Sequence, residues 1–346
     1  MPPIYRRATA VLRLASVLTT SGGNMTARLT RRDAICCGAI GLGATAGGLL
    51  CAPAAAGQQE TAKPESSFTF CLNTGTIRGF KLSLVEEIDL TAKAGYQGIE
   101  LWMDNVHRYV ESGGSLAEVK KRTADAGLKI EGAIAFPAWG VDDQAQRTKA
   151  LEQIKRDMEL LSKIGGLRIA VPPAGINNRT DIDLRKLAER YRAVLELGKQ
   201  MGIAAQLEIW GTAKTLGRYS DAVLVAIEAD HPDACLLLDV YHIYRSGMGF
   251  NGLRLLSGLG MPMLHINDYP ADPPRESLTD AHRVFPGDGV APLDEILRTL
   301  YAVGFRGALS LELFNREYWK QTPEWVAKTG LEKMRAAVAK AFAGKS

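Results

Sequence analysis

The 346-residue sequence predicts an α/β protein: a single-domain (β/α)8 barrel, or TIM barrel, preceded by a cleavable export signal. Two observations predict the barrel: eight short apolar runs follow the N-terminal segment, and amphipathic helical patterns separate these runs. A third observation predicts the signal, since the basic excess of the chain is confined to its first 57 residues. Hydrophobic residues make up 46% of the chain and charged residues 23%, a balance typical of globular rather than disordered proteins.

The N-terminal segment, residues 1–56, has the pattern of a twin-arginine export signal. Arg31 and Arg32 precede an uncharged stretch, Ala34–Leu50, which is only mildly apolar because it is rich in glycine and alanine. The small-residue pattern Ala54–Ala56 follows and resembles a cleavage site. We therefore expect the twin-arginine export machinery as a partner and the periplasm as the location of the mature protein.

Two alternatives for this segment fit the residues less well. A membrane anchor needs about 20 strongly apolar residues, and a leucine directly before Cys51 is a poor match to a lipoprotein site. Translation could start at Met1 or at Met25, since the signal needs nothing before the second methionine. A polar linker, residues 57–67, then leads to the barrel domain, residues 68–346.

The charge distribution argues against a protein that binds nucleic acid. The formal net charge is +4, but residues 1–57 hold six arginines and one acid, so the rest of the chain carries −1. Nucleic-acid binding requires a basic surface. We therefore expect no nucleic-acid partner.

The eight apolar runs are expected to form the parallel strands of the barrel, because a sheet covered on both faces consists of continuous apolar segments. In chain order the runs are Phe68–Ile77, Gly98–Met103, Leu128–Phe136, Leu167–Pro172, Ala204–Trp210, Cys235–Tyr241, Met263–Asn267 and Ala308–Phe314. The helical patterns between them end at glycines such as Gly95 and Gly304, as helices commonly do. An open doubly wound sheet is the alternative, but no glycine-rich phosphate loop follows the first run.

Four ionisable residues stand near the carboxyl ends of the last four runs, where barrel enzymes hold their active sites. They are Glu208, Asp239, His265 and Glu312. A single acid at a strand end is usually a salt-bridged structural group. Three carboxylates and one imidazole at the same end of the barrel need a stronger source of positive charge to offset the cost of burying them. A divalent cation provides it, and this oxygen-rich set suits Mn²⁺, Mg²⁺ or Co²⁺.

With this order of residues, the sequence resembles the xylose-isomerase-like barrel superfamily. Within it, the sequence is most similar to the sugar phosphate isomerase/epimerase group, which includes ketose 3-epimerases, inosose dehydratases and hydroxypyruvate isomerases. The similarity extends from Phe68 to the end, and its most specific parts are Leu207-Glu208, Leu238–His242, His265–Asp268 and Leu311-Glu312.

The resemblance implies a ligand set of Glu208, Asp239, His265 and Glu312 for one divalent metal ion, with manganese preferred over magnesium, cobalt or zinc. It also implies that Glu208 and Glu312 lie on opposite faces of the substrate and transfer protons. A small sugar or keto-polyol is then the expected substrate. Barrels of this group often form homo-oligomers, but the sequence leaves the oligomeric state open.

Further residues are expected to contact the substrate. His242 matches a family histidine that contacts a substrate oxygen, although it could instead buttress Asp239. The family often holds a substrate hydroxyl with an arginine that follows the metal-binding histidine. Here the loop 268–290 offers Arg275 and Arg283, and we prefer Arg283 because a turn sequence directly follows it.

Aromatic and acidic residues near the strand ends complete the candidate list. Trp102 and Trp210 are expected to stack on a sugar face, and Phe136 and Trp139 could do the same or pack in the core. Asp268 could orient His265 or form a turn, and Glu100 is expected to be a buried polar group inside the barrel.

We therefore expect a metal-dependent sugar isomerase or epimerase that acts on a keto sugar or polyol derivative by proton transfer through an enediolate. A lyase or dehydratase that forms the same enediolate and then expels a β-substituent is the first alternative. A non-catalytic exported carbohydrate-binding barrel is the second. The metal-dependent nucleases of the superfamily need histidines in the second and third runs, and this sequence has none there.

Overall fold

The computed structural model describes residues 64–343, which form a closed barrel of eight parallel strands that pair in chain order. The strands are β1 (Thr69–Asn73), β2 (Gly98–Trp102), β3 (Lys129–Ile134), β4 (Arg168–Val171), β5 (Ala204–Glu208), β6 (Cys235–Asp239), β7 (Met263–Ile266) and β8 (Ala308–Leu311). Each lies within one of the eight apolar runs, so the predicted barrel is confirmed.

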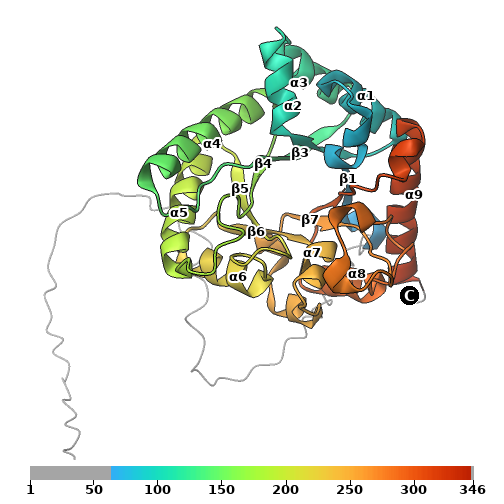
Figure 1. Ribbon diagram of the computed structural model, residues 1–346. Helices are drawn as coiled ribbons and strands as arrows, with labels where there is room; N and C mark the ends of the chain where they lie inside the picture. Colours follow the sequence, from blue (N-terminus) through green and yellow to red (C-terminus); the bar gives the residue numbers. More distant parts are fainter. Residues whose placement is uncertain (1–63, 344–346) are drawn as a thin grey trace, which may run out of the picture. The chain divides into compact units, whose positions relative to one another are not determined.

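Helices surround the strands on the outside of the barrel (Figure 1). They are α1 (Leu84–Ala94), α2 (Met103–Glu111), α3 (Leu116–Asp125), α4 (Gln144–Ile164), α5 (Leu184–Met201), α6 (Tyr219–Glu228), α7 (Val240–Arg245), α8 (Leu293–Ala302) and α9 (Pro323–Phe342). Their ends follow the sequence signals: Ser83 caps α1 in a capping box with Glu86, and Gly95 ends that helix with a φ of 91°.

The connection between β6 and β7 differs from the regular pattern. It holds only the short helix α7 and the 3-10 segments Asn251–Leu255 and Gly258–Gly260. Five glycines lie between positions 247 and 260, and glycine is a poor helix former because its backbone loses the most entropy. A full-length covering helix is therefore absent from this unit of the described chain.

The predicted export signal, residues 1–56, and most of the predicted linker lie outside the described residues. The last four linker residues, Pro64–Ser67, form a short 3-10 helix before β1. Among residues 64–343, no helix combines the length and the hydropathy needed to cross a membrane.

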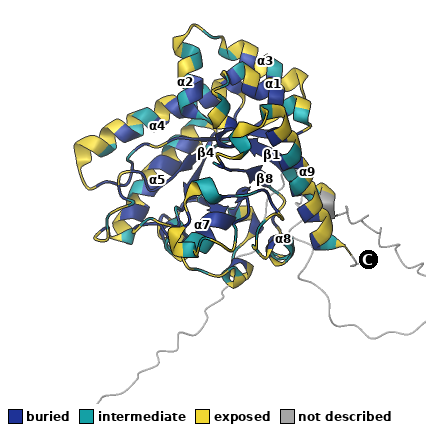
Figure 2. Cartoon of the chain, turned by 45° about the vertical axis from the view of Figure 1, so that its right-hand side comes forward, coloured by how far each residue is buried: buried dark blue, intermediate teal, exposed yellow. Residues whose placement is uncertain are grey.

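The barrel has two apolar clusters, a large one between strands and helices and a small one in the lumen. In Figure 2 the strands are buried, and the helices expose their outer faces. The lumen cluster consists of side chains from several strands: Cys71, Ile134, Ala170, Leu237, Met263 and Ala308. Because side chains alternate along a strand, the residue two positions further along faces the lumen as well. Leu237 is thus followed by Asp239, and Met263 by His265, which places polar groups at the carboxyl ends above an apolar plug.

Some predicted runs extend beyond the strands they contain. The first run reaches residue 77, but β1 ends at Asn73, whose side chain caps the 3-10 helix Thr74–Phe80. The eighth run reaches residue 314, but β8 ends at Leu311. Glu312 therefore stands on the chain just after the strand, at the mouth of the barrel.

Candidate active site

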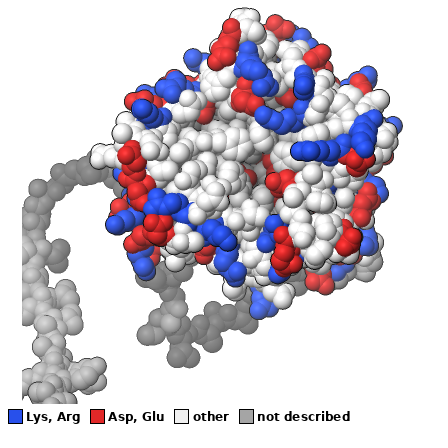
Figure 3. Space-filling model, in the orientation of Figure 1, with Lys and Arg blue, Asp and Glu red and all other residues white. Residues whose placement is uncertain are grey.

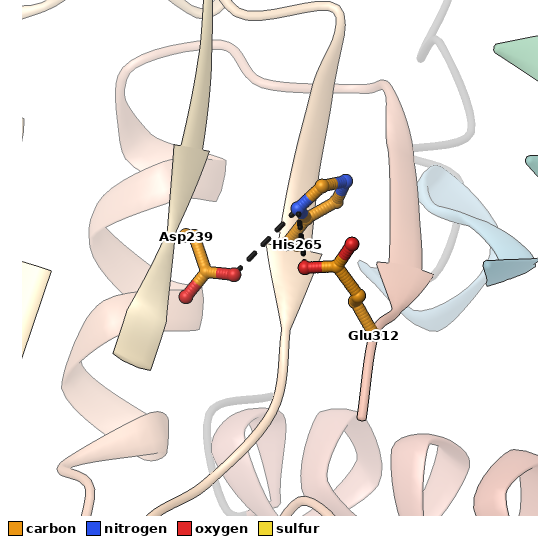
Figure 4. A group of neighbouring side chains, drawn as sticks. All are labelled: Asp239, His265 and Glu312. Carbon is orange, nitrogen blue, oxygen red and sulfur yellow. Dashed lines mark ion pairs between the residues drawn. The ribbon is translucent and has the colours of Figure 1, made fainter. Parts of the chain in front are cut away.

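Three side chains from neighbouring strands meet at the carboxyl end of the barrel. Asp239 pairs in register with His265, and Glu312 follows β8, which pairs with β7. His265 Nδ1 lies 3.6 Å from Asp239 Oδ2 and 3.3 Å from Glu312 Oε2. In Figure 4 both carboxylates point toward this ring nitrogen. Asp239, His265 and Glu312 are buried, and each offers an atom within 4.8 Å of the others, which suits one metal ion. We call these three residues the ligand group.

Glu208, the fourth predicted ligand, ends β5 outside this group. Its Oε1 accepts a hydrogen bond from Trp210 Nε1 at 3.2 Å, but its Oε2 has no partner among residues 64–343. Burial, together with the nearby carboxylates, raises the pKa of Glu208 to about 8. His265 Nδ1 is likewise buried without a hydrogen bond. Glu208 Oε2 and His265 Nδ1 are thus buried atoms that can bind a metal and that have no hydrogen-bond partner among the described residues. Such atoms suit a divalent cation, because burying them without a partner costs stability.

Arg283 supplies the positive charge at the centre of the site. Its side chain is 1% exposed, and Nη1 donates to Asp239 Oδ2 at 2.9 Å and to Glu312 Oε2 at 2.8 Å. Its Nη2 donates to Asp280 Oδ1 at 2.9 Å. Arg283 lines the cavity described below, whereas Arg275 is partly exposed and pairs with its neighbour Glu276. The role of Arg283 in holding a substrate hydroxyl stays a prediction.

These cations set the ionisation of the two carboxylates. Burial alone would raise the pKa of Asp239, but the charge of Arg283 holds it well below its usual range. Burial also opposes ionisation of Glu312, and His265 and Arg283 lower its pKa nevertheless. The pKa of His265 is raised well above its usual value by Glu100 and Glu312, although its burial acts in the opposite direction.

His242 lies in the first turn of α7, beside Arg283. Its Nε2 accepts a hydrogen bond from Arg283 Nη2 at 3.1 Å, which leaves Nδ1 as a buried donor without a partner among the described residues. Burial is the main cause that lowers the pKa of His242. Asp239 Oδ1 accepts from the backbone N–H of His242 rather than from its ring. The ring therefore does not buttress Asp239 and is free to contact a ligand.

A cavity of about 200 Å³ opens beside these groups. It is smaller than the pockets of ~300–1,000 Å³ that hold drug-sized ligands, so it suits a molecule near the size of one sugar ring. Its walls combine polar and aromatic side chains: Trp102, Ile134, Phe136, Glu208, Trp210, Thr212, His242, Asp280, Arg283, Glu312 and Phe314. In Figure 3 the surface around the centre of the barrel is mostly uncharged, with acidic groups near the middle.

The aromatic side chains form a continuous wall of this cavity. The Trp102 ring lies 5.1 Å from that of Phe136 and 5.9 Å from that of Phe314, and Phe136 lies 6.1 Å from Trp210. Trp139 is not part of the wall, because it is 1% exposed and donates to the carbonyl of Pro172 in the core. Trp139 is therefore a core residue, one of the two roles that the sequence left open.

Asp268 has the second of its two suggested roles. Its carboxylate accepts hydrogen bonds from the backbone N–H groups of Tyr269, Gly287, Gly289 and Ala291. It therefore fixes the loop that carries Arg283 instead of orienting His265.

Sequence reasoning missed several residues that contact the site. Asn73 donates to Glu312 Oε1 at 3.1 Å, and Asn267 donates to Asp239 Oδ2 at 3.2 Å. Asp280 and Phe314 line the cavity. An asparagine within or at the end of an apolar run is a signal that could have identified Asn73 and Asn267, because a buried amide must find partners.

Residues 88–337 match the family model of the xylose isomerase-like TIM barrel, which covers most of the chain. The chain belongs to this family. Inosose isomerase of Bacillus velezensis is 28% identical over 264 residues, which are 75% of this chain and 94% of that protein. The 3-dehydroshikimate dehydratase of Pseudomonas putida is 25% identical over 236 residues, 67% of this chain but 36% of that protein.

Solved structures show the same fold. A crystal structure of the IolI protein with a bound zinc atom superimposes with a TM-score of 0.73 at 24% identity, covering 80% of this chain and all of that one. The family model and the curated relatives, an inosose isomerase and a 3-dehydroshikimate dehydratase among them, confirm the predicted membership of the xylose-isomerase-like group.

Proposed function

We propose that this protein is a metal-dependent isomerase or epimerase of a small keto sugar or keto-polyol. One observation carries the proposal: two glutamates, Glu208 and Glu312, line the same 200 Å³ cavity, and one of them belongs to the ligand group. The inosose isomerase relative supports this class of substrate.

The two glutamates suit complementary proton transfers. Without a metal, His265 and Arg283 lower the pKa of Glu312, whereas burial raises the pKa of Glu208 to about 8. Carboxyl groups whose environments separate their pKa values are suited to act as base and acid. Glu312 would remove a proton from the carbon next to the substrate carbonyl, which forms an enediolate, and Glu208 would return a proton to the other face or to the neighbouring atom.

The remaining side chains bind and enclose the substrate. Asp239, His265 and Glu312, with Glu208 as the fourth ligand, would hold the metal, for which we prefer manganese. When bound, the ion would stabilise the negative charge that develops on the substrate oxygens. The free Nδ1–H of His242 and the guanidinium of Arg283 would donate to substrate hydroxyls, while the walls made by Trp102 and Trp210 exclude water.

A dehydratase is the second candidate, because a 3-dehydroshikimate dehydratase is among the relatives. It would begin with the same proton removal and then expel a β-hydroxyl. The two outcomes differ in the product, since an epimer keeps the mass of the substrate, whereas dehydration lowers it by one water.

Solvent exchange tests the proposal. The mature protein, loaded with Mn²⁺, is incubated in D₂O with inososes and unphosphorylated ketohexoses, and mass spectrometry follows deuterium incorporation into substrate and product. We expect incorporation with at least one substrate and a loss of about 10²–10⁴-fold in rate for Glu312→Gln. A Glu312→Gln protein that exchanges at the wild-type rate would refute the assigned role, and exchange by neither protein would favour a carbohydrate-binding barrel.

We also propose that residues 1–56 direct export by the twin-arginine route, which carries folded proteins. The support is the sequence pattern around Arg31 and Arg32. A free sugar or inositol derivative then suits the compartment better than a sugar phosphate.

A further inference from the structure

A buried polar cluster lies on the other side of the His265 ring from the ligand group. Its centre is Glu100 in β2, which is 1% exposed. Three donors converge on one oxygen, Glu100 Oε2: Ser310 Oγ at 2.7 Å, Asn73 Nδ2 at 2.9 Å and His265 Nε2 at 3.0 Å. No arginine or lysine pairs with Glu100 within the described chain.

The contact with His265 fixes which ring nitrogen faces the ligand group. A carboxylate only accepts hydrogen bonds, so His265 Nε2 carries a hydrogen and donates it to Glu100. The nitrogen that remains is Nδ1, which lies 3.6 Å from Asp239 Oδ2 and 3.3 Å from Glu312 Oε2. Rotating the ring by half a turn would break the contact with Glu100 and point Nε2 elsewhere.

The same cluster reaches the proposed proton-transferring residue. Asn73 donates through Nδ2 to both Glu100 Oε2 and Glu312 Oε1, and its Oδ1 accepts from Trp102 Nε1 at 2.9 Å. Glu100 therefore connects a member of the ligand group with the amide that holds Glu312. A buried carboxylate oxygen with three converging donors restrains the side chains that donate to it.

We propose that Glu100 is a positioning residue, which orients His265 so that Nδ1 binds the metal and which increases the electron density of that imidazole. The proposal rests on the proposed function, because it needs a metal at the ligand group. Carboxylates that accept from the far nitrogen of a metal-binding histidine increase metal affinity, and their loss costs about 10- to 100-fold in affinity or activity.

Another buried strand carboxylate offers a matched control. Glu131 in β3 is 5% exposed and pairs with Arg168 Nη1 at 2.6 Å, and it makes no contact with the ligand group. Replacing either glutamate by glutamine preserves side-chain shape and removes one buried negative charge. Only the replacement of Glu100 changes the partner of His265.

The experiment measures metal affinity of the metal-free mature protein by calorimetric titration with Mn²⁺ and Zn²⁺, together with the visible spectrum of the Co²⁺ form. For Glu100→Gln we expect about 10- to 100-fold weaker affinity and an altered Co²⁺ spectrum, whereas Glu131→Gln should match the wild type in both. Glu100→Asp keeps the charge but withdraws the carboxylate from His265, so it should also bind weakly. This variant decides the question if Glu100→Gln does not fold.

Wild-type affinity and an unchanged Co²⁺ spectrum in a folded Glu100 variant would overturn the inference. An equal loss in Glu131→Gln would also overturn it, because the effect would then reflect a general cost of losing a buried charge. A wild-type protein that binds no divalent ion would be a different result, since it would overturn the proposed function itself.

Discussion

Replacing Arg283 by methionine should make the stability of the barrel depend on metal. The guanidinium of Arg283 is 1% exposed and contacts Asp239, Asp280 and Glu312 at 2.8 to 2.9 Å. Methionine keeps most of the side-chain volume but leaves two fully buried carboxylates, Asp239 and Glu312, without this partner. Breaking a buried ion pair in this way costs about 3–5 kcal/mol.

The magnitude can be converted into a melting temperature. For a domain of this size, 1 kcal/mol shifts Tm by about 2–4 °C, so the metal-free variant should melt about 6–20 °C below the metal-free wild type. A divalent ion at the ligand group would supply the missing positive charge, and at a concentration of 100 Kd it adds about 2.7 kcal/mol. Because Arg283 Nη1 occupies the oxygens of Asp239 and Glu312 in the wild type, Mn²⁺ should stabilise the variant more than the wild type.

Differential scanning calorimetry with EDTA and with Mn²⁺ measures both effects. Arg179→Met is the matched control, because Arg179 also contacts two carboxylates, Asp142 and Asp181, but at the exposed surface. Its Tm should stay close to that of the wild type, since exposed ion pairs contribute little. A metal-free Arg283→Met protein that loses less than about 1 kcal/mol would refute the reasoning, because the two carboxylates would then not depend on the arginine.

Three further predictions concern metal binding, pH and export. Asp239→Asn should lose the bound divalent ion, which elemental analysis checks; full metal content would exclude Asp239 as a ligand. Burial raises the pKa of Glu87 from 4.5 to about 8, so between these pH values the unfolded chain releases a proton that the folded chain retains, and stability falls as pH rises. Glu87→Gln should flatten that fall in denaturant titrations at several pH values, and an unchanged slope would contradict the assignment. Replacing Arg31 and Arg32 by lysines should retain the precursor in the cytoplasm, as fractionation would show, whereas normal export would rule out a twin-arginine signal.

Much of the architecture could be predicted because the determining signals are local. A parallel strand covered on both faces is a short apolar run, and all eight runs contain a strand. Asp239 and His265 interrupt such runs with ionisable groups near the carboxyl ends of the strands, where barrel enzymes hold their active sites, so their position at the barrel mouth could be predicted. The candidate ligands could therefore be named before any contact between them was known.

The sequence was less informative wherever a residue's role depends on distant partners. Asp268 and Trp139 both stood near strand ends and kept two roles open, and the structure chose loop fixation for the first and core packing for the second. Loop geometry and side-chain packing decide such cases, and neither leaves a periodic pattern in the sequence.

The sequence by itself determined the fold class, the four ionisable residues at the strand ends and the basic N-terminal segment. The tertiary structure decided which partners stabilise the buried ionisable groups. Arg283 donates to both Asp239 and Glu312, and Glu100 accepts from His265, which lies 165 positions further along the chain. The physical reason is the closure of the barrel. Closure fixes the register of strands that are far apart in sequence, and a buried polar group can be assigned a partner only after that register is known.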